Sequence, residues 1–109
     1  MTPKSRIVWS PDYEVDIGAH VFPIVKYRLV RDRLLEEGIV SPDAFLAPEP
    51  APRSALARVH DEVYLEKIER GIMSQAEIFR LELPFSDELR EAMILCCGGT
   101  ILALRQALE

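Results

Sequence analysis

Few side chains in this sequence could do chemistry by themselves. Its two histidines, His20 and His60, lie far apart, and its two cysteines, Cys96 and Cys97, are adjacent. These residue types bind zinc or act as bases and nucleophiles, but a zinc site needs three or four ligands brought together. Neighbouring helix positions point about 100° apart, and apolar surroundings disfavour a thiolate, so we interpret the cysteines as structural. The sequence predicts no catalytic residue, no metal site and no cofactor within this chain.

Composition narrows the class of protein. The chain has 109 residues, of which 49% are hydrophobic and 28% charged, as expected of one small globular domain. Its formal net charge of -5 disfavours bulk nucleic-acid binding. The absence of a disulfide framework and of an apolar leader favours a reducing, cytoplasmic location. No uncharged apolar run reaches the roughly 18 residues that a membrane span needs.

The expected elements are one strand and several helices. Residues 7–9 form a short β-prone run that is ended by Ser10 and Pro11. Apolar residues recur at helical spacing over 24–37, and residues 41–53 are interpreted as a proline-rich surface connection. Three later helices are predicted from their N-cap residues, which are Asp61, Ser74 and Ser86.

The last predicted helix does not suit a small free-standing protein. Residues 92–104 carry no charge, and a helix that is apolar on every side is normally buried on every side. We therefore expect residues 1–109 to be a single partial domain, mostly α with one short N-terminal strand, from the N-terminal part of a larger α/β domain. The alternative is a small helical protein that covers this surface by forming oligomers.

Four stretches, in order, resemble the histone deacetylase and acetylpolyamine amidohydrolase superfamily, and in particular its compact bacterial members. The resemblance covers residues 7–108. It is carried by Ser10-Pro11-Asp12-Tyr13 after the strand, by His20-Val21-Phe22-Pro23 leading into Lys26-Tyr27-Arg28, by Val59-His60-Asp61 with Tyr64-Leu65, and by Gly98-Gly99-Thr100.

The resemblance implies a fold and an activity. Its fold is the arginase-deacetylase architecture, in which a parallel sheet is sandwiched by helices. Its members hydrolyse acetylated amines with one divalent metal, usually zinc, which two aspartates and a histidine hold. Those ligands lie in segments that are not in this chain. The implied zinc, and an acetylated amine or acetyl-lysine substrate, therefore belong to a full-length parent, and the chain itself is expected to be inactive.

The resemblance also suggests four residues that border the substrate. His20 and Phe22 match one lip of the active-site tunnel, but local packing is an equal alternative for His20 and fits Phe22 better. Glu62 falls where relatives carry an aspartate at the pocket rim, and an exposed helix charge is an equal alternative. Lys26 matches a basic position that lines a product channel for acetate, and the alternative is a solvated lysine. We interpret His60 as a structural residue at a helix entrance.

Three functions follow as hypotheses. The first is a scaffold and pocket-wall segment of a bacterial zinc-dependent deacetylase-like hydrolase, whose partner is the remainder of the catalytic domain. The second is a self-contained module that associates with itself through the helix at 92–104. The third is a non-catalytic partner subunit. None of them involves nucleic acid or a membrane.

Overall fold

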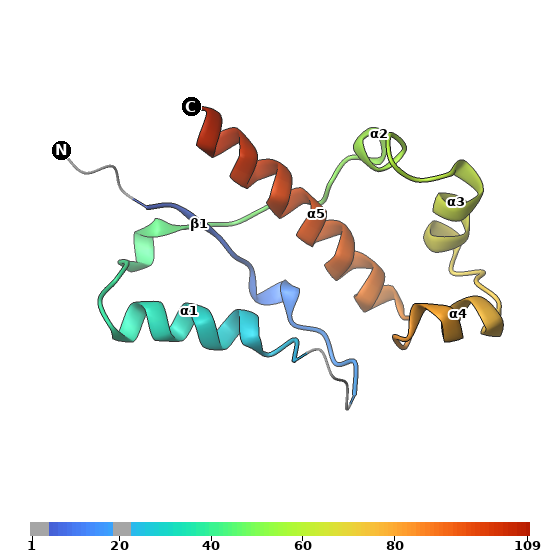
Figure 1. Cartoon of the computed structure of the whole chain (residues 1–109), viewed down its shortest axis with the longest axis horizontal. Helices are drawn as coiled ribbons and strands as arrows, with labels where there is room; N and C mark the ends of the chain where they lie inside the picture. The colour runs from blue at the N-terminus through green and yellow to red at the C-terminus, as the bar shows by residue number, and fades with distance from the viewer. Residues whose placement is uncertain (1–4, 19–22) are drawn as a thin grey trace.

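The computed structural model describes residues 5–18 and 23–109. Helices dominate this part of the chain, and two very short strands accompany them (Figure 1). In chain order the elements are β1 (Ile7–Val8), the 3-10 turn η1 (Pro11–Tyr13), α1 (Lys26–Glu36), the 3-10 turn η2 (Pro42–Ala44), β2 (Phe45–Leu46), α2 (Arg53–Leu56), α3 (Glu62–Arg70), α4 (Gln75–Leu81) and α5 (Asp87–Leu108).

The helices begin where the polar caps predict. Asp61 accepts a hydrogen bond from the Val63 amide at the start of α3, and Ser86 accepts one from the Leu89 amide at the start of α5. Ser74 and Glu77 form a complete capping box at the start of α4. Each cap satisfies backbone amides that a helix end leaves without a partner, so these starts were predictable from sequence.

Left-handed glycines end two of the helices. Gly38 follows α1 with a φ of 68°, and Gly71 ends α3 with a φ of 65°. Residues with a Cβ rarely adopt this conformation, which explains why glycine stands at both positions. The amide of Ile39 donates to the Leu34 carbonyl and closes the end of α1.

The strands β1 and β2 pair in parallel. Ile7 lies opposite Phe45 and Val8 opposite Leu46, and the Trp9 amide donates to the Leu46 carbonyl at 3.0 Å. Trp9 and Phe45 extend the pair with an edge-on ring contact. The connection between the two strands runs through α1, so β1, α1 and β2 form one crossover unit.

The expected fold class is wrong for this chain. The described residues form five helices and a two-stranded parallel ribbon, not a parallel sheet sandwiched by helices and not a single unpaired strand. The cause is local. Ser10 and Pro11 end the first β-prone run, and Phe45–Leu46 is confined between η2 and Pro48. Strands of two residues cannot build the sheet of an arginase-deacetylase fold.

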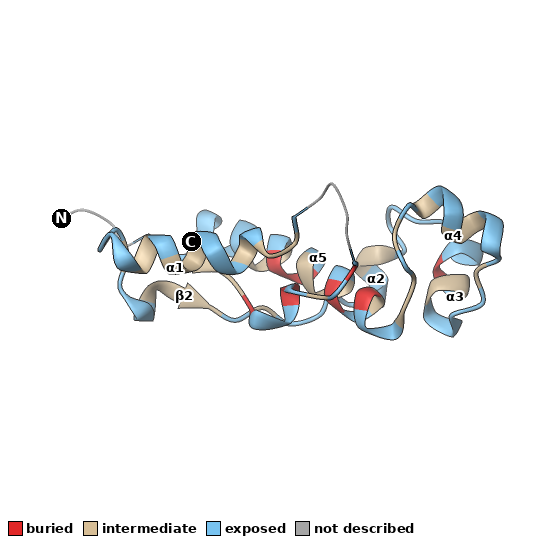
Figure 2. Ribbon diagram, turned by 90° about the horizontal axis from the view of Figure 1, so that it is seen from below, coloured by how far each residue is buried: buried red, intermediate tan, exposed pale blue. Residues whose placement is uncertain are grey.

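The molecule is long and thin. Its principal extents are 52, 33 and 17 Å, and its radius of gyration is 16.1 Å, against roughly 13 Å for a compact chain of this length. α5 crosses its middle, with α1 and the strands on one side and α2, α3 and α4 on the other (Figure 1). The buried residues are few and lie mainly along this crossing (Figure 2).

Candidate functional site

The first of the resembling stretches forms a tight turn beneath α5. Ser10 is buried and its hydroxyl accepts the Asp12 amide at 3.1 Å, which fixes the turn η1 directly after β1. Tyr13, at the end of η1, is only 7% exposed and meets the ring of Tyr27 edge-on at 5.7 Å. Burial raises the pKa of both phenols above their usual range, so they stay neutral and pack as aromatic residues.

Two glycines let α5 approach the rest of the chain. A Cβ on Gly98 would lie 1.7 Å from the Glu49 carbonyl oxygen, and a Cβ on Gly99 would lie 2.1 Å from the Tyr13 hydroxyl. Backbone therefore leaves no room for a side chain at Gly98, and the Tyr13 side chain leaves none at Gly99. The Ala51 amide also donates to the Ile94 carbonyl of α5 at 3.2 Å.

Lys26 lies at the edge of a hollow between α1 and β1. The hollow has a volume of about 330 Å³, and aromatic rings form much of its wall. The Lys26 ammonium lies 5.7 Å from the centre of the Tyr27 ring, and the Arg31 guanidinium lies 4.3 Å from that of Trp9. Both cations therefore rest on aromatic faces, a contact that the ring quadrupole favours.

Glu62 is held by an arginine of the preceding helix. Arg53 bonds both carboxylate oxygens of Glu62, and its Nε donates to Glu69 at 2.6 Å. The hydrogen bonds from Arg53 lower the pKa of the Glu62 carboxyl, although the group is exposed. This carboxylate could meet a substrate only after Arg53 had released it, so the structure favours a role in joining α2 to α3.

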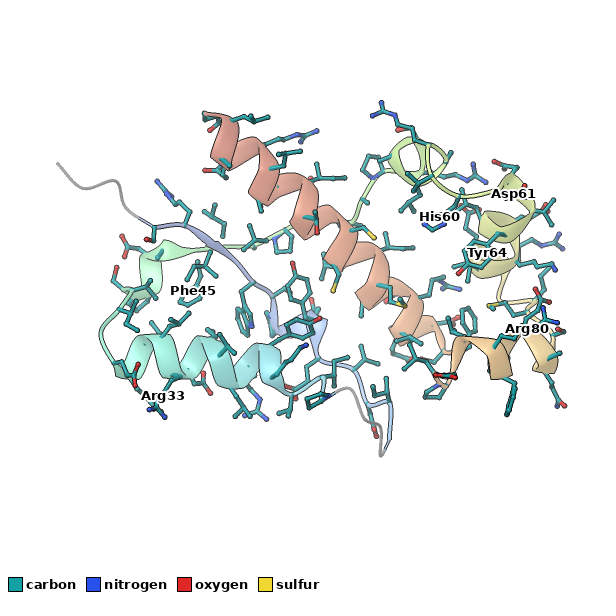
Figure 3. All side chains as sticks on the ribbon, in the orientation of Figure 1. Arg33, Phe45, His60, Asp61, Tyr64 and Arg80 are labelled. Carbon is teal, nitrogen blue, oxygen red and sulfur yellow. The ribbon has the colours of Figure 1, made fainter. Side chains whose placement is uncertain are left out.

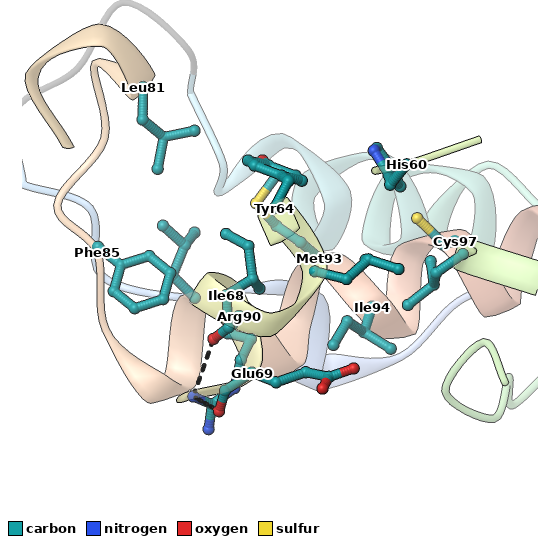
Figure 4. A pocket seen from close by; sticks show the side chains of 13 residues that line it. His60, Tyr64, Ile68, Glu69, Leu81, Phe85, Arg90, Met93, Ile94 and Cys97 are labelled. Carbon is teal, nitrogen blue, oxygen red and sulfur yellow. Dashed lines mark hydrogen bonds between the residues drawn. The ribbon is translucent and has the colours of Figure 1, made fainter. Parts of the chain in front are cut away.

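His60 and Tyr64 border an apolar cavity between α3 and α5. Their rings lie 5.5 Å apart, and the cavity behind them has a volume of about 150 Å³. Figure 4 shows His60 and Tyr64 on one side of it and Met93, Ile94 and Cys97 of α5 on another. Among the described residues His60 contacts an aromatic ring and an apolar cavity, and its structural role stays a prediction.

Arg90 fastens α5 to the end of α3. Its guanidinium donates to the carbonyls of Ile68 and Glu69, at 3.5 and 3.3 Å, and it pairs with Asp87 on its own helix. Carbonyls at a helix C-terminus carry partial negative charge, so a cation there is favourable. Sequence reasoning missed this residue, since nothing in the sequence placed it near α3.

The candidate residues do not meet in one place. Lys26 lies at the start of α1, and Glu62 at the start of α3, on the other side of α5 (Figure 3 shows α3 with His60, Asp61 and Tyr64 labelled). His20 and Phe22 lie outside the described residues. No group of three or more histidine, cysteine, aspartate or glutamate residues within 5–18 and 23–109 is placed to hold a metal ion.

What the described stretches share is a place around α5. The Ser10–Tyr13 turn contacts Gly99, Tyr27 contacts Tyr13, and Tyr64 shares a cavity with the first half of α5. Each therefore packs on or near the helix that carries Gly98 and Gly99. The arrangement can support and shape a neighbouring site, but these residues supply no reacting group.

Comparison with known proteins yields one relative. No family model matches the chain. An uncharacterized protein of Picosynechococcus sp. is 34% identical to it over 104 residues, which are 94% of this chain and 35% of that protein. The chain thus spans about a third of the length of this relative.

Proposed function

We propose that this chain is a scaffold and pocket-wall segment of a larger, cytoplasmic, bacterial zinc-dependent deacetylase-like amidohydrolase. The observation that carries the proposal is the meeting of the resembling stretches around α5. Tyr13 and Gly99 are in contact although 86 positions separate them in the sequence. Long-range packing of this kind is what a scaffold segment requires.

The packing of the chain supports the larger-protein part of the proposal. The accessible surface is 8064 Å², whereas a compact monomer of this mass exposes roughly 6,100 Å². The difference of roughly 2,000 Å² exceeds the roughly 800 Å² that each partner buries in an interface of standard size. Within the described residues the buried Trp9 indole N–H also has no hydrogen-bond acceptor, which is uncommon in a finished core.

The zinc of such an enzyme does not fit the residues described here. They bring no set of ligands together, so any metal would be held by polypeptide outside this segment. The role left to this chain is to position the walls of the pocket. Lys26 lines a hollow, and its ammonium could attract a carboxylate product there, which supports the proposed channel role.

A second candidate function is a helical module that associates with itself through α5, and the exposed apolar face of that helix favours it. The mass of the intact native gene product distinguishes the two. A product several times heavier than 12.4 kDa supports the proposal of a scaffold segment within a larger enzyme. A product of 12.4 kDa supports the self-associating module and contradicts the enzymatic proposal.

The enzymatic proposal is tested on the intact product. We expect it to hold about one zinc per chain and to release acetate from an acetyl-lysine peptide or an acetylpolyamine. Lys26→Met should slow turnover at least tenfold, while Arg33→Met, at the other end of α1, serves as the matched control. An intact product with neither metal nor amide hydrolysis would contradict the proposal.

A further inference from the structure

One face of α5 carries an exposed apolar stripe, and none of the other elements within residues 5–18 and 23–109 covers its second half. It consists of Met93, Cys97, Thr100, Leu104 and Leu108, which we call the α5 seam, and all five are exposed. Steps of four and three residues keep them on one side of the helix. The buried glycines, Gly98 and Gly99, lie on other sides. Spacing in steps of three and four residues is typical of the contact line between two packed helices.

The chemistry of the seam suits a dry helix contact. Met93 is 47% exposed, Leu104 60% and Leu108 79%. The Thr100 hydroxyl, the one strongly polar group in the seam, donates to the Cys96 carbonyl of its own helix at 3.3 Å. Burying the seam would therefore leave no hydrogen-bonding group of the seam without a partner.

The seam continues a contact that the chain already makes. Met93 and Cys97 line the cavity beside α3, and Leu89, just before them, is only 3% exposed. α3 and α4 thus cover the start of this face and leave it open from Cys97 to Leu108. That stretch of twelve residues is about 18 Å long, which is enough for three helical turns of a partner.

A lipid bilayer is a poor occupant of this face. By length and hydropathy alone, the 22 residues of α5 could cross a membrane, and only 17% of its most apolar window is buried. However, the glycine side of α5 is in backbone contact with the segment around Glu49 and close to η1 with Asp12. A spanning α5 would carry these carboxylates into hydrocarbon, which costs several kcal/mol for each charge.

We propose that the α5 seam is the docking surface for an apolar helix supplied by the remainder of the same gene product. Two observations favour this occupant. The chain exposes more surface beyond that of a compact monomer than one partner buries in a standard interface, and about two-thirds of the relative lies outside the matching segment. The seam has no charge, so the partner helix must also present an uncharged stripe. The inference rests on the larger protein proposed above, but not on its deacetylase chemistry.

Cys97 reports directly on whether the seam is covered. In a Cys96→Ala background, the Cys97 thiol is labelled with N-ethylmaleimide in the native gene product, and the rate is compared with that in urea. We expect native labelling to be at least tenfold slower. Leu104→Lys should bring the rate back toward the urea value, whereas Glu91→Lys, an exposed position off the seam, should not. Circular dichroism checks that each variant keeps its helices.

Several outcomes overturn the proposal. Equal labelling in buffer and in urea means that the seam is open. Protection that is lost on dilution, together with dissociation of a dimer in light scattering, assigns the seam to a second copy. Protection that needs phosphatidylcholine vesicles assigns it to a membrane. The labelling rate does not depend on enzymatic activity. A protected seam in a protein without deacetylase activity would therefore support this inference and contradict the proposed function.

Discussion

Gly98 is the residue whose substitution tests the packing of α5 most directly. Helix propensity alone would make Gly98→Ala stabilising by about 1 kcal/mol. The added methyl group would, however, meet the Glu49 carbonyl, which belongs to backbone and cannot rotate away. We expect a net loss of about 2 kcal/mol or more in the free energy of unfolding, measured by urea titration. Glu91→Ala, at an exposed position of α5 off the seam, is the control and should change stability little. A more stable Gly98→Ala protein would contradict the close approach.

Arg53 and Glu62 give a second prediction at this scale. Hydrogen bonds from Arg53 hold the pKa of the Glu62 carboxyl below its ordinary value. Arg53→Met should therefore raise that pKa toward the usual range, and an NMR titration of the Glu62 side chain measures the change. Lys67→Met, which removes a cation paired with Glu77 instead, should leave Glu62 unaffected. If Arg53→Met left the Glu62 titration where it was, the lock between α2 and α3 would be absent.

At the scale of elements, α4 should depend on pH through its capping box. Hydrogen bonds from Lys67, and then from Ser74, lower the pKa of the Glu77 carboxyl to about 2. Because this folded-state pKa lies below the ordinary 4.5, the stabilisation is present above pH 4.5 and is lost as the pH falls toward 2. The backbone amides of α4 should therefore lose protection from hydrogen exchange, followed by NMR, as the pH falls from 4.5 toward 2. In Glu77→Gln this loss should disappear, and in the control Glu91→Gln it should persist.

Local elements of this chain are largely predictable, whereas their partners are not. The caps at Asp61, Ser74 and Ser86 act within three residues, so the sequence alone places the starts of α3, α4 and α5. The strand β2 escaped prediction because two residues give no periodicity to detect. Its existence depends on pairing with β1, a contact between positions 38 apart in the chain.

The candidate site shows the same division. Residue types and spacing predicted a structural role for His60, which packs beside the Tyr64 ring, but they did not reveal which segments Gly98 approaches. They did not reveal the hydrogen bonds between Arg53 and the Glu62 carboxylate, because these bonds depend on the orientation of α2 relative to α3. The predicted fold class failed for a related reason, since a resemblance in order and spacing does not by itself supply the strands that a layered sheet needs.

For the whole molecule, the thin shape predicts poor behaviour of the chain in isolation. A surface roughly 2,000 Å² larger than that of a compact monomer is too apolar to stay solvated without cost. We expect the 109-residue chain to be oligomeric or loosely packed, as measured by light scattering and by thermal unfolding. A compact monomer that melts in one cooperative step would contradict this expectation.

Metal content gives a second prediction for the whole chain. Because the described residues gather no set of zinc ligands, the purified 109-residue chain should hold no stoichiometric zinc by elemental analysis after dialysis. Zinc bound at one equivalent per chain, and retained against a chelator, would point to ligands that this arrangement does not explain.

The contact between Tyr13 and Gly99 also bears on how the protein is made. A ribosome adding about 5–20 residues per second takes roughly 4–17 s to travel between these two positions. Both strands of the β1–β2 ribbon have been made only once Leu46 is added, and Gly99 of the helix that covers them follows 53 positions later. The nascent chain therefore exposes apolar surface for seconds. Chaperones have time to bind this surface. The tertiary packing of the chain can form only after α5 has been made.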